Sequence, residues 1–351
     1  MKQKIVSLLL IGLLIGCHDE TVIFQLVRPS WVSHPSFTLI NKIKFNSFSN
    51  GQSLFLYGPS YFSVLTKDRV VKHYVTFFDY PFGEKLPINN TFFLSSTIND
   101  SFIGFWPVAQ PDFAAAIVYF DLKPFDEYFN RKNFDLSEGK ENMSINNANQ
   151  CLVPYYSDNP DKKISLFLID IGNLSPPFLS LKKVQRITIN EPANIPGGNV
   201  SYIKPIDDFF IVSTASKTYK ILSNGTVKQI LTYKMDEAFK WAGEIYLMSK
   251  ASQVAKSADD GVTWDEFTDT PASLATGTYY VLGDSLVLNN GDAIFSAKFK
   301  LPKYSLRELK NDGVAGNIVT SVSEFNDSIY VTTYSGVFYK SRKEFFNSKP
   351  K

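Results

Sequence analysis

The chain has few of the residues that build disulfide frameworks and histidine-based sites. Its 351 residues include only two cysteines, Cys17 and Cys151, and three histidines, His18, His34 and His73. Two cysteines are too few for a disulfide framework or a thiolate zinc site. Cys151 lies in an apolar run and is expected to be a small buried side chain. Two of the histidines lie near the N-terminus, so we expect no metal and no histidine-based catalytic triad.

The chain also lacks an excess of charge of either sign. It has 36 basic and 34 acidic residues, and two of the lysines, Lys2 and Lys4, lie in a segment that we expect to be removed. A nucleic-acid-binding protein needs a basic face, and a polybasic membrane anchor needs clustered lysines. The balance of charge therefore argues against both. No glycine-rich loop has the spacing of a phosphate or dinucleotide site, so we expect no cofactor.

No apolar run reaches the roughly 20 residues that a transmembrane helix needs, but a shorter run follows the positive N-terminus. Residues 5–15 have the dimensions of a signal-peptide core, and the sequence then reads Leu-Ile-Gly-Cys up to Cys17. This sequence resembles the lipobox of bacterial lipoproteins. The resemblance implies that 1–16 are a signal peptide that is removed, and that acyl chains on Cys17 anchor the protein to a membrane. The alternative is an ordinary signal peptide with an incidental cysteine.

The residues after the cysteine bear on the location of the protein. The chain continues His18-Asp19-Glu20, so the aspartate of the enterobacterial inner-membrane retention signal does not follow Cys17. The acidic pair resembles the surface-export signal of lipoproteins from the Bacteroidetes group. We therefore expect an outer-membrane, cell-surface location, with the periplasmic face as the alternative. Residues 17–35 are expected to form a tether.

The rest of the chain predicts an all-β fold. Phenylalanine (30) and tyrosine (18) are abundant, and aromatic residues favour strands. A unit of strand, short turn and strand recurs at intervals of roughly 35 to 45 residues, which is the range of a four-stranded propeller blade. Clear copies begin near Phe210, Ile245, Ser285 and Ile329, and weaker ones near Leu54, Ser101 and Cys151.

These copies predict one β-propeller domain over residues 36–346. Seven blades of four strands agree best with the count, and six or eight are the alternatives. A polar stretch near 126–148, rich in Asn, Asp, Glu and Lys, predicts an inserted loop.

One segment in the C-terminal half has a specific motif. It has Ser257, Asp259, Gly261, Thr263 and Trp264 at the defined positions of the Asp-box, and so resembles the BNR repeat of sialidase-like propellers. The resemblance implies a hairpin between the two outer strands of a blade, at the periphery. The Asp259 carboxylate can accept hydrogen bonds from turn amides, and Gly261 permits a positive φ. We expect a structural role for the motif.

No catalytic set accompanies the motif. A sialidase-like site needs three arginines, a tyrosine–glutamate pair and an acidic aspartate, and Arg28-Pro29 falls in the expected tether. The other arginines do not fall on expected inner strands: Arg69, Arg131, Arg186, Arg307 and Arg342. We therefore expect no enzyme.

A binding face is expected where the loops between second and third strands gather. Two of these loops contain tyrosines, Tyr57 and Tyr334, and tyrosine is a common interface anchor. The alternative for each is ordinary packing within a blade.

Together these features predict a lipid-anchored, outer-membrane or cell-surface propeller. Its expected role is a non-catalytic protein-binding or scaffolding subunit of a membrane-associated complex. The alternative is a glycan-binding or sialidase-like, glycan-active surface lipoprotein, which rests on fold analogy alone.

Overall fold

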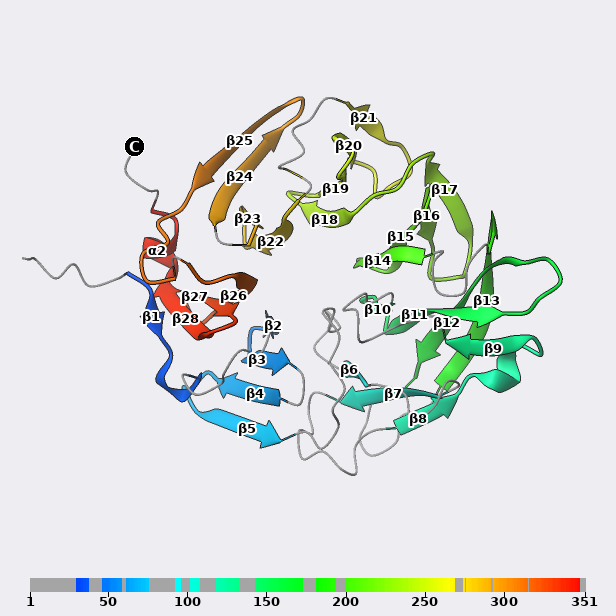
Figure 1. The fold of residues 1–351 in the computed structure, drawn as a ribbon, viewed down its shortest axis with the longest axis horizontal. Helices are drawn as coiled ribbons and strands as arrows, with labels where there is room; N and C mark the ends of the chain where they lie inside the picture. The colour runs from blue at the N-terminus through cyan, green and yellow to red at the C-terminus, as the bar shows by residue number, and fades with distance from the viewer. Residues whose placement is uncertain are drawn as a thin grey trace, which may run out of the picture.

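The structure is a computed structural model. It describes residues 30–37, 46–58, 61–75, 92–95, 102–107, 118–132, 143–172, 181–193, 200–268, 274, 276–291, 293–314 and 316–347. The strands of these residues form seven antiparallel sheets that are arranged around a central axis (Figure 1). The predicted all-β fold with four-stranded sheets is confirmed. We call the sheets blades 1 to 7 in chain order.

Each blade has an inner strand next to the axis, and its other strands follow outward (Figure 1). Blade 1 contains β2 (Asn46–Ser49), β3 (Ser53–Gly58), β4 (Tyr61–Thr66) and β5 (Val71–Val75). Blade 2 contains β6 (Phe92–Ser95), β7 (Phe102–Pro107) and β8 (Val118–Asp121). Blade 3 contains β10 (Ser144–Ile145), β11 (Gln150–Ser157), β12 (Lys163–Ile171) and β13 (Leu181–Pro192), with β9 (Phe129–Lys132) paired to β11.

The remaining blades follow the same order. Blade 4 contains β14 (Val200–Ile206), β15 (Phe209–Thr214), β16 (Thr218–Ile221) and β17 (Val227–Leu231). Blade 5 contains β18 (Glu237–Trp241), β19 (Glu244–Ser249), β20 (Gln253–Ser257) and β21 (Asp265–Phe267). Blade 6 contains β22 (Thr278–Leu282), β23 (Ser285–Asn289), β24 (Ile294–Lys300) and β25 (Lys303–Glu308). Blade 7 contains β26 (Val319–Phe325), β27 (Ser328–Thr333), β28 (Gly336–Ser341) and β1 (Val32–Ser33).

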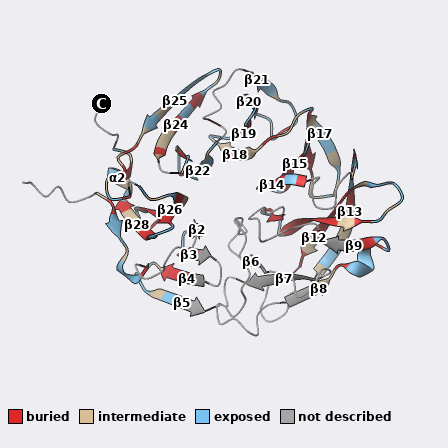
Figure 2. Cartoon of the chain, in the orientation of Figure 1, coloured by how far each residue is buried: buried red, intermediate tan, exposed pale blue. Residues whose placement is uncertain are grey.

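The core lies between the faces of neighbouring blades. The second strands are buried on both faces, as in β15, where every residue is buried, whereas the outer strand β25 is largely exposed (Figure 2). One apolar cluster joins Ile211 of blade 4 to Leu247 of blade 5. A strand that packs against blades on both sides reads as a continuous apolar run. This explains why the second strands gave the clearest sequence repeat.

The N-terminal segment closes the ring, and it corrects a predicted boundary. Strand β1 pairs with β28, with Val32 opposite Tyr339. The Ser30 amide donates to Asp312 at 2.6 Å, and the Trp31 ring nitrogen donates to the Lys310 carbonyl at 3.2 Å. The prediction that 17–35 are a tether is therefore wrong for its last residues, because the Trp31 side chain, 2% exposed, packs into the core of blade 7.

The predicted inserted loop near 126–148 needs a second correction. Both ends of this stretch belong to blade 3, since β9 and β10 pair with β11. Apolar residues hold them there: Phe129 and Ile145 lie in one buried cluster with Phe167. Residues 133–142 lie outside the described residues. The polar composition concealed these short strands because their apolar residues are few and widely spaced.

Three short helices complete the described chain: η1 (Pro35–Phe37), η3 (Lys123–Phe125) and α2 (Arg342–Phe345). None of the helices in this part of the chain has the length and apolar character needed to cross a membrane.

Candidate functional site

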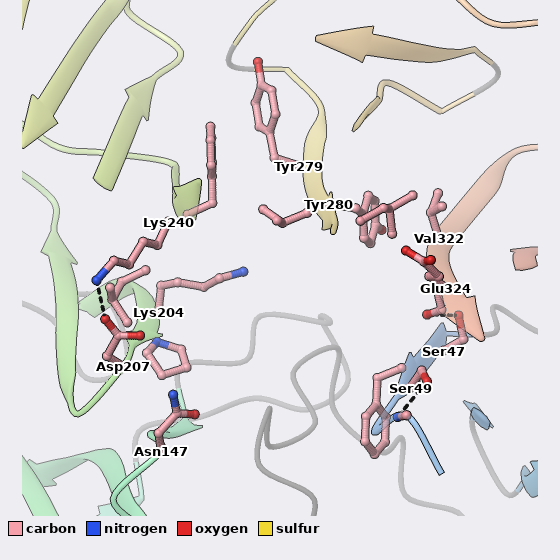
Figure 3. A pocket seen from close by; sticks show the side chains of 18 residues that line it. Ser47, Ser49, Asn147, Lys204, Asp207, Lys240, Tyr279, Tyr280, Val322 and Glu324 are labelled. Carbon is pink, nitrogen blue, oxygen red and sulfur yellow. Dashed lines mark hydrogen bonds and ion pairs between the residues drawn. The ribbon is translucent and has the colours of Figure 1, made fainter. Parts of the chain in front are cut away.

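The inner strands surround a cavity of about 600 Å³ on the axis of the ring. We call it the central pocket. Strands β2, β14, β18, β22 and β26 contribute its walls, and Asn147 reaches it from the turn after β10 (Figure 3). The contributing segments come from six of the seven blades, so the pocket is a property of the closed ring and of no single repeat.

The central pocket lies at the C-terminal ends of the inner strands. Its wall includes Gly51, Asn147 and Asp207, which belong to turns that lead from a first strand to a second. Neighbouring strands within each blade are antiparallel. The turns between third and fourth strands therefore lie toward this same end, and the turns between second and third strands lie at the opposite end.

Aromatic and aliphatic side chains form one wall of the pocket. Tyr280 is half-buried and donates from its hydroxyl to the Thr320 carbonyl at 3.2 Å, and burial raises its pKa. Val281 beside it is 43% exposed although it is aliphatic. Across the pocket, Phe48 stacks on Phe55 with ring centroids 4.7 Å apart. The pocket thus offers apolar surface to an occupant.

A network of hydrogen-bonded hydroxyl groups joins blades 1 and 7 at the wall of the pocket. The Ser47 hydroxyl of β2 lies 2.8 Å from the hydroxyls of both Ser321 and Ser323 on β26. The Thr332 hydroxyl continues the chain at 2.6 Å from Ser321. All four side chains are buried, and their mutual hydrogen bonds satisfy groups that would be costly to bury alone.

Most charged groups of the pocket are neutralised by close partners. The Lys240 ammonium donates to Asp207 at 2.6 Å and to Asp260 at 2.8 Å, and these bonds raise the pKa of Lys240. Glu324 accepts a hydrogen bond from Arg342, which follows β28. The pair of Lys240 with Asp207 joins blades 5 and 4, whereas the pairs with Asp260 and between Glu324 and Arg342 each lie within one blade.

Lys204 differs from the other charged residues of the pocket. Figure 3 shows its side chain extending from β14 toward the middle of the cavity. Within the described part of the chain, its ion pair is with Glu237, at 3.7 Å. That separation is too long for a hydrogen bond. The Glu237 carboxylate already accepts bonds from the Tyr202 hydroxyl at 3.0 Å and from the Ala238 amide at 3.2 Å.

The segment from Ser257 to Trp264 forms a compact turn between β20 and β21. Asp259 accepts hydrogen bonds from the Thr263 hydroxyl at 2.6 Å and from the Thr263 amide at 2.9 Å. The Ser257 hydroxyl donates to Asp259 at 2.8 Å and accepts from the Gly261 amide at 2.8 Å. Gly261 has φ +78°. The hydrogen bonds to Asp259, led by that from Thr263, hold its pKa well below the usual range.

The same turn also contacts blade 4. The Lys220 ammonium of β16 donates to the Asp260 carbonyl and lies 4.0 Å from the centre of the Phe209 ring. The Asp260 carboxylate accepts from Lys240, and this bond lowers the pKa of Asp260. The Trp264 ring packs against the apolar cluster shared by blades 4 and 5. The turn thus links two blades at the periphery, outside the wall of the central pocket.

Of the two tyrosines predicted to form a binding face, only Tyr334 has a described side chain, and it does not line this pocket. Tyr334 is 40% exposed in the turn between β27 and β28, at the opposite end of blade 7. The Tyr57 backbone belongs to β3, but its side chain lies outside the described residues, as does all of Cys17. Cys151 is buried, as expected.

Sequence reasoning missed the main residues of the pocket, Lys204 and Val281. Both lie on inner strands, which precede the repeated strand pairs that the sequence made visible. A weaker signal was present in retrospect, because a short run that contains apolar residues precedes each of the clear predicted pairs. That signal gives no indication of which residues face the axis.

No arginine or histidine is among the described residues that line the central pocket. Across the described residues, no group of three or more metal-ligating side chains is assembled.

Comparison with known proteins identifies the fold. No protein-family model matches the chain, and no curated protein matches it either. Several solved structures match the chain. A virginiamycin B lyase from Staphylococcus aureus, crystallised as a catalytically inactive variant with quinupristin, has a TM-score of 0.54 and 8% identity; the match covers 88% of this chain and 97% of that one.

Two further structures agree. BamB from Moraxella catarrhalis has a TM-score of 0.50 and 10% identity, and the match covers 85% of this chain and 84% of that one. YCF48 bound to D1 peptide has a TM-score of 0.55 and 8% identity, with coverage of 90% and 98%. These similarities show that the chain is a β-propeller.

Proposed function

We propose that this chain is a lipid-anchored β-propeller of the outer membrane or cell surface that binds a segment of a partner protein in its central pocket. It serves as a non-catalytic scaffolding subunit of a membrane-associated complex. The observation that carries this proposal is the pocket itself, a cavity of about 600 Å³ with exposed apolar surface at Val281 and a charged group at Lys204.

The pocket and one structural similarity together support a peptide segment as the occupant. A concave site with apolar walls and a few placed polar groups is typical of ligand recognition. One structurally similar propeller, YCF48, is solved bound to D1 peptide. Another, the virginiamycin B lyase, is made inactive by replacing one histidine, whereas no histidine lines the described pocket here. These points support binding over catalysis.

The anchor in this proposal is the acylated Cys17. Ser30, which is hydrogen-bonded to Asp312, lies thirteen positions after it in the chain. A chain of that length spans at most about 45 Å when fully extended. Acyl chains on one cysteine are sufficient to hold the protein at a membrane surface, and the acidic pair that follows Cys17 supports the outer location.

Site-specific photo-crosslinking in intact cells tests the proposal. A photoreactive phenylalanine analogue is placed at Val281 in the pocket, at Tyr334 at the opposite end, and at Val262 as a control at the periphery that is 59% exposed. We expect a discrete protein adduct from position 281 and none from position 262. An adduct from position 334 alone would move the interface to the opposite face.

A blocking variant checks the same interface independently. Val281→Glu places a carboxylate at an exposed position of the pocket wall, and we expect it to abolish co-purification of the partner in mild detergent. Val262→Glu is the matched control and should retain the partner. A wild-type protein that purifies as a monomer with no adduct from any position would contradict the proposal.

A further inference from the structure

Among the described charged residues that line the pocket, Lys204 alone has a counterion beyond hydrogen-bond distance. Lys240 has Asp207 and Asp260 at 2.6 and 2.8 Å, and Glu324 has Arg342. For Lys204 the described structure gives only Glu237, at 3.7 Å. An ammonium group has three donors, so Lys204 can still donate into the cavity that it enters (Figure 3).

We propose that the central pocket selects an acidic residue flanked by apolar residues, with the carboxylate bound by Lys204. This inference rests on the proposed function, since it names the chemistry of the segment that the pocket receives. An occupant that fills the cavity would displace water from around Lys204, whose side chain is 24% exposed. Desolvating a cation is costly unless an anionic or strongly polar acceptor replaces the water.

The positions of the apolar side chains define the rest of the segment. The pocket wall includes Pro205 next to Lys204 on β14, and Val281 with Tyr280 on β22. A carboxylate bound at Lys204 therefore has apolar surface around it, which suits aliphatic or aromatic neighbours in the bound peptide. A purely polar acidic segment would leave that surface unfilled.

The surrounding charges favour a carboxylate over a phosphate. Glu237, Glu324 and Asp207 all lie in or next to the pocket. A phosphorylated residue has a charge of about −1.5 to −2 and would be repelled by these carboxylates more strongly than a single carboxylate. One lysine also matches one carboxylate without the bidentate geometry that arginine offers to phosphate.

Capped synthetic peptides test the selection directly. The probe is a fluorescent hexapeptide, Gly-Leu-Asp-Phe-Leu-Gly, blocked at both ends, and it is compared with versions that have Asn or phosphoserine in place of Asp. We expect wild-type protein to bind the Asp peptide about tenfold more tightly than the Asn peptide, as for one charge-assisted hydrogen bond. The phosphoserine peptide should bind less tightly than the Asp peptide.

Lys204→Met removes the charge and keeps an unbranched apolar side chain. The variant should bind the Asp and Asn peptides equally. Lys204→Glu should prefer a peptide with Lys in place of Asp. Lys217→Met is the matched control, because Lys217 is a surface lysine at the opposite end of blade 4 that pairs with Glu191 at 3.6 Å. It should keep the wild-type preference, and a thermal denaturation curve confirms that each variant is folded.

The outcomes separate this inference from the proposed function. Equal binding of Asp and Asn peptides by wild-type protein, or a preference that survives in Lys204→Met, would overturn the role of Lys204. Failure of all the peptides to bind would overturn the acidic–apolar class. In any of these cases, a partner adduct from position 281 would still support the pocket as a protein-binding site. Loss of that adduct would overturn both.

Discussion

Asp259 shows how a single side chain can organise a turn by remaining ionised. It accepts bonds from the hydroxyls of Thr263 and Ser257 and from the Thr263 amide. Bonds to the charged form hold its pKa below the usual value of 3.8. The folded state therefore binds its proton less readily than the unfolded state. The stabilisation is fully present above pH 3.8 and is lost as the pH falls below that value toward the folded pKa.

Asp259→Asn should lower the midpoint of urea denaturation at neutral pH, because an amide nitrogen replaces one acceptor oxygen. The difference from wild type should shrink as the pH is lowered from about 5 to about 3, where the wild-type carboxylate loses its advantage. Asp265→Asn, at an exposed position of the neighbouring strand, is the control and should have little effect. A difference that stays constant across this pH range would contradict the assignment.

At the scale of one element, β1 and the residue before it contribute more to the stability of the fold than the length of the strand suggests. It completes blade 7, and the preceding Trp31 places its ring edge-on to Phe345, 5.8 Å between centroids, beneath the Lys340 ammonium at 5.1 Å. Since Trp31 is 2% exposed, its removal leaves a cavity in a densely packed cluster.

Trp31→Ala should lower the free energy of unfolding by about 3 kcal/mol, the low end of the usual cost of truncating a buried tryptophan. Val32→Ala, at a neighbouring position that is 50% exposed, should cost less than about 0.5 kcal/mol. Urea denaturation of both variants measures the difference. Equal effects would show that the ring does not depend on this segment.

The burial of each strand explains which strands could be predicted from the sequence and which could not. Second strands such as β15 and β19 have continuous apolar runs and were predicted, because neighbouring blades bury both of their faces. Inner strands such as β14 also face the axis with polar residues, Lys204 among them, and this weakens the pattern. The short β1 and β10 pair too few residues to show any periodicity.

The pocket could not be predicted because no local segment contains it. Its lining runs from Ser47 in blade 1 to Glu324 in blade 7, so only ring closure brings these residues together. Tyr334 was chosen from a correct strand pair but lies at the other end of the blade. The repeated apolar runs of the sequence identify strands and turns, but they do not show at which end of the ring a pocket lies.

At the scale of the whole molecule, acyl chains on Cys17 are proposed to attach the propeller to a membrane. Cys17→Ser should release the protein from the membrane fraction into the soluble fraction after cell lysis, because no acyl chain can be attached. Its midpoint of urea denaturation should match that of wild type, since Cys17 precedes Ser30, where the described fold begins. Fractionation and immunoblotting measure the distribution.

Cys151→Ala is the matched control for that experiment. Cys151 is buried in blade 3, so its loss should affect stability and leave the membrane attachment unchanged. A Cys17→Ser protein that remains in the membrane fraction would contradict the anchor.

The hydrogen bonds from Ser30 to Asp312 join residues 282 positions apart in the chain. Contacts of such long separation are among the last to form, because closing a long loop costs conformational entropy before any contact forms in return. Until β28 has been synthesised, β1 therefore has no partner strand and the ring is open. A protein that loses β1 leaves the edge of β28 unpaired and available to other strands. Ring closure thus depends on pairing the first described strand with the last.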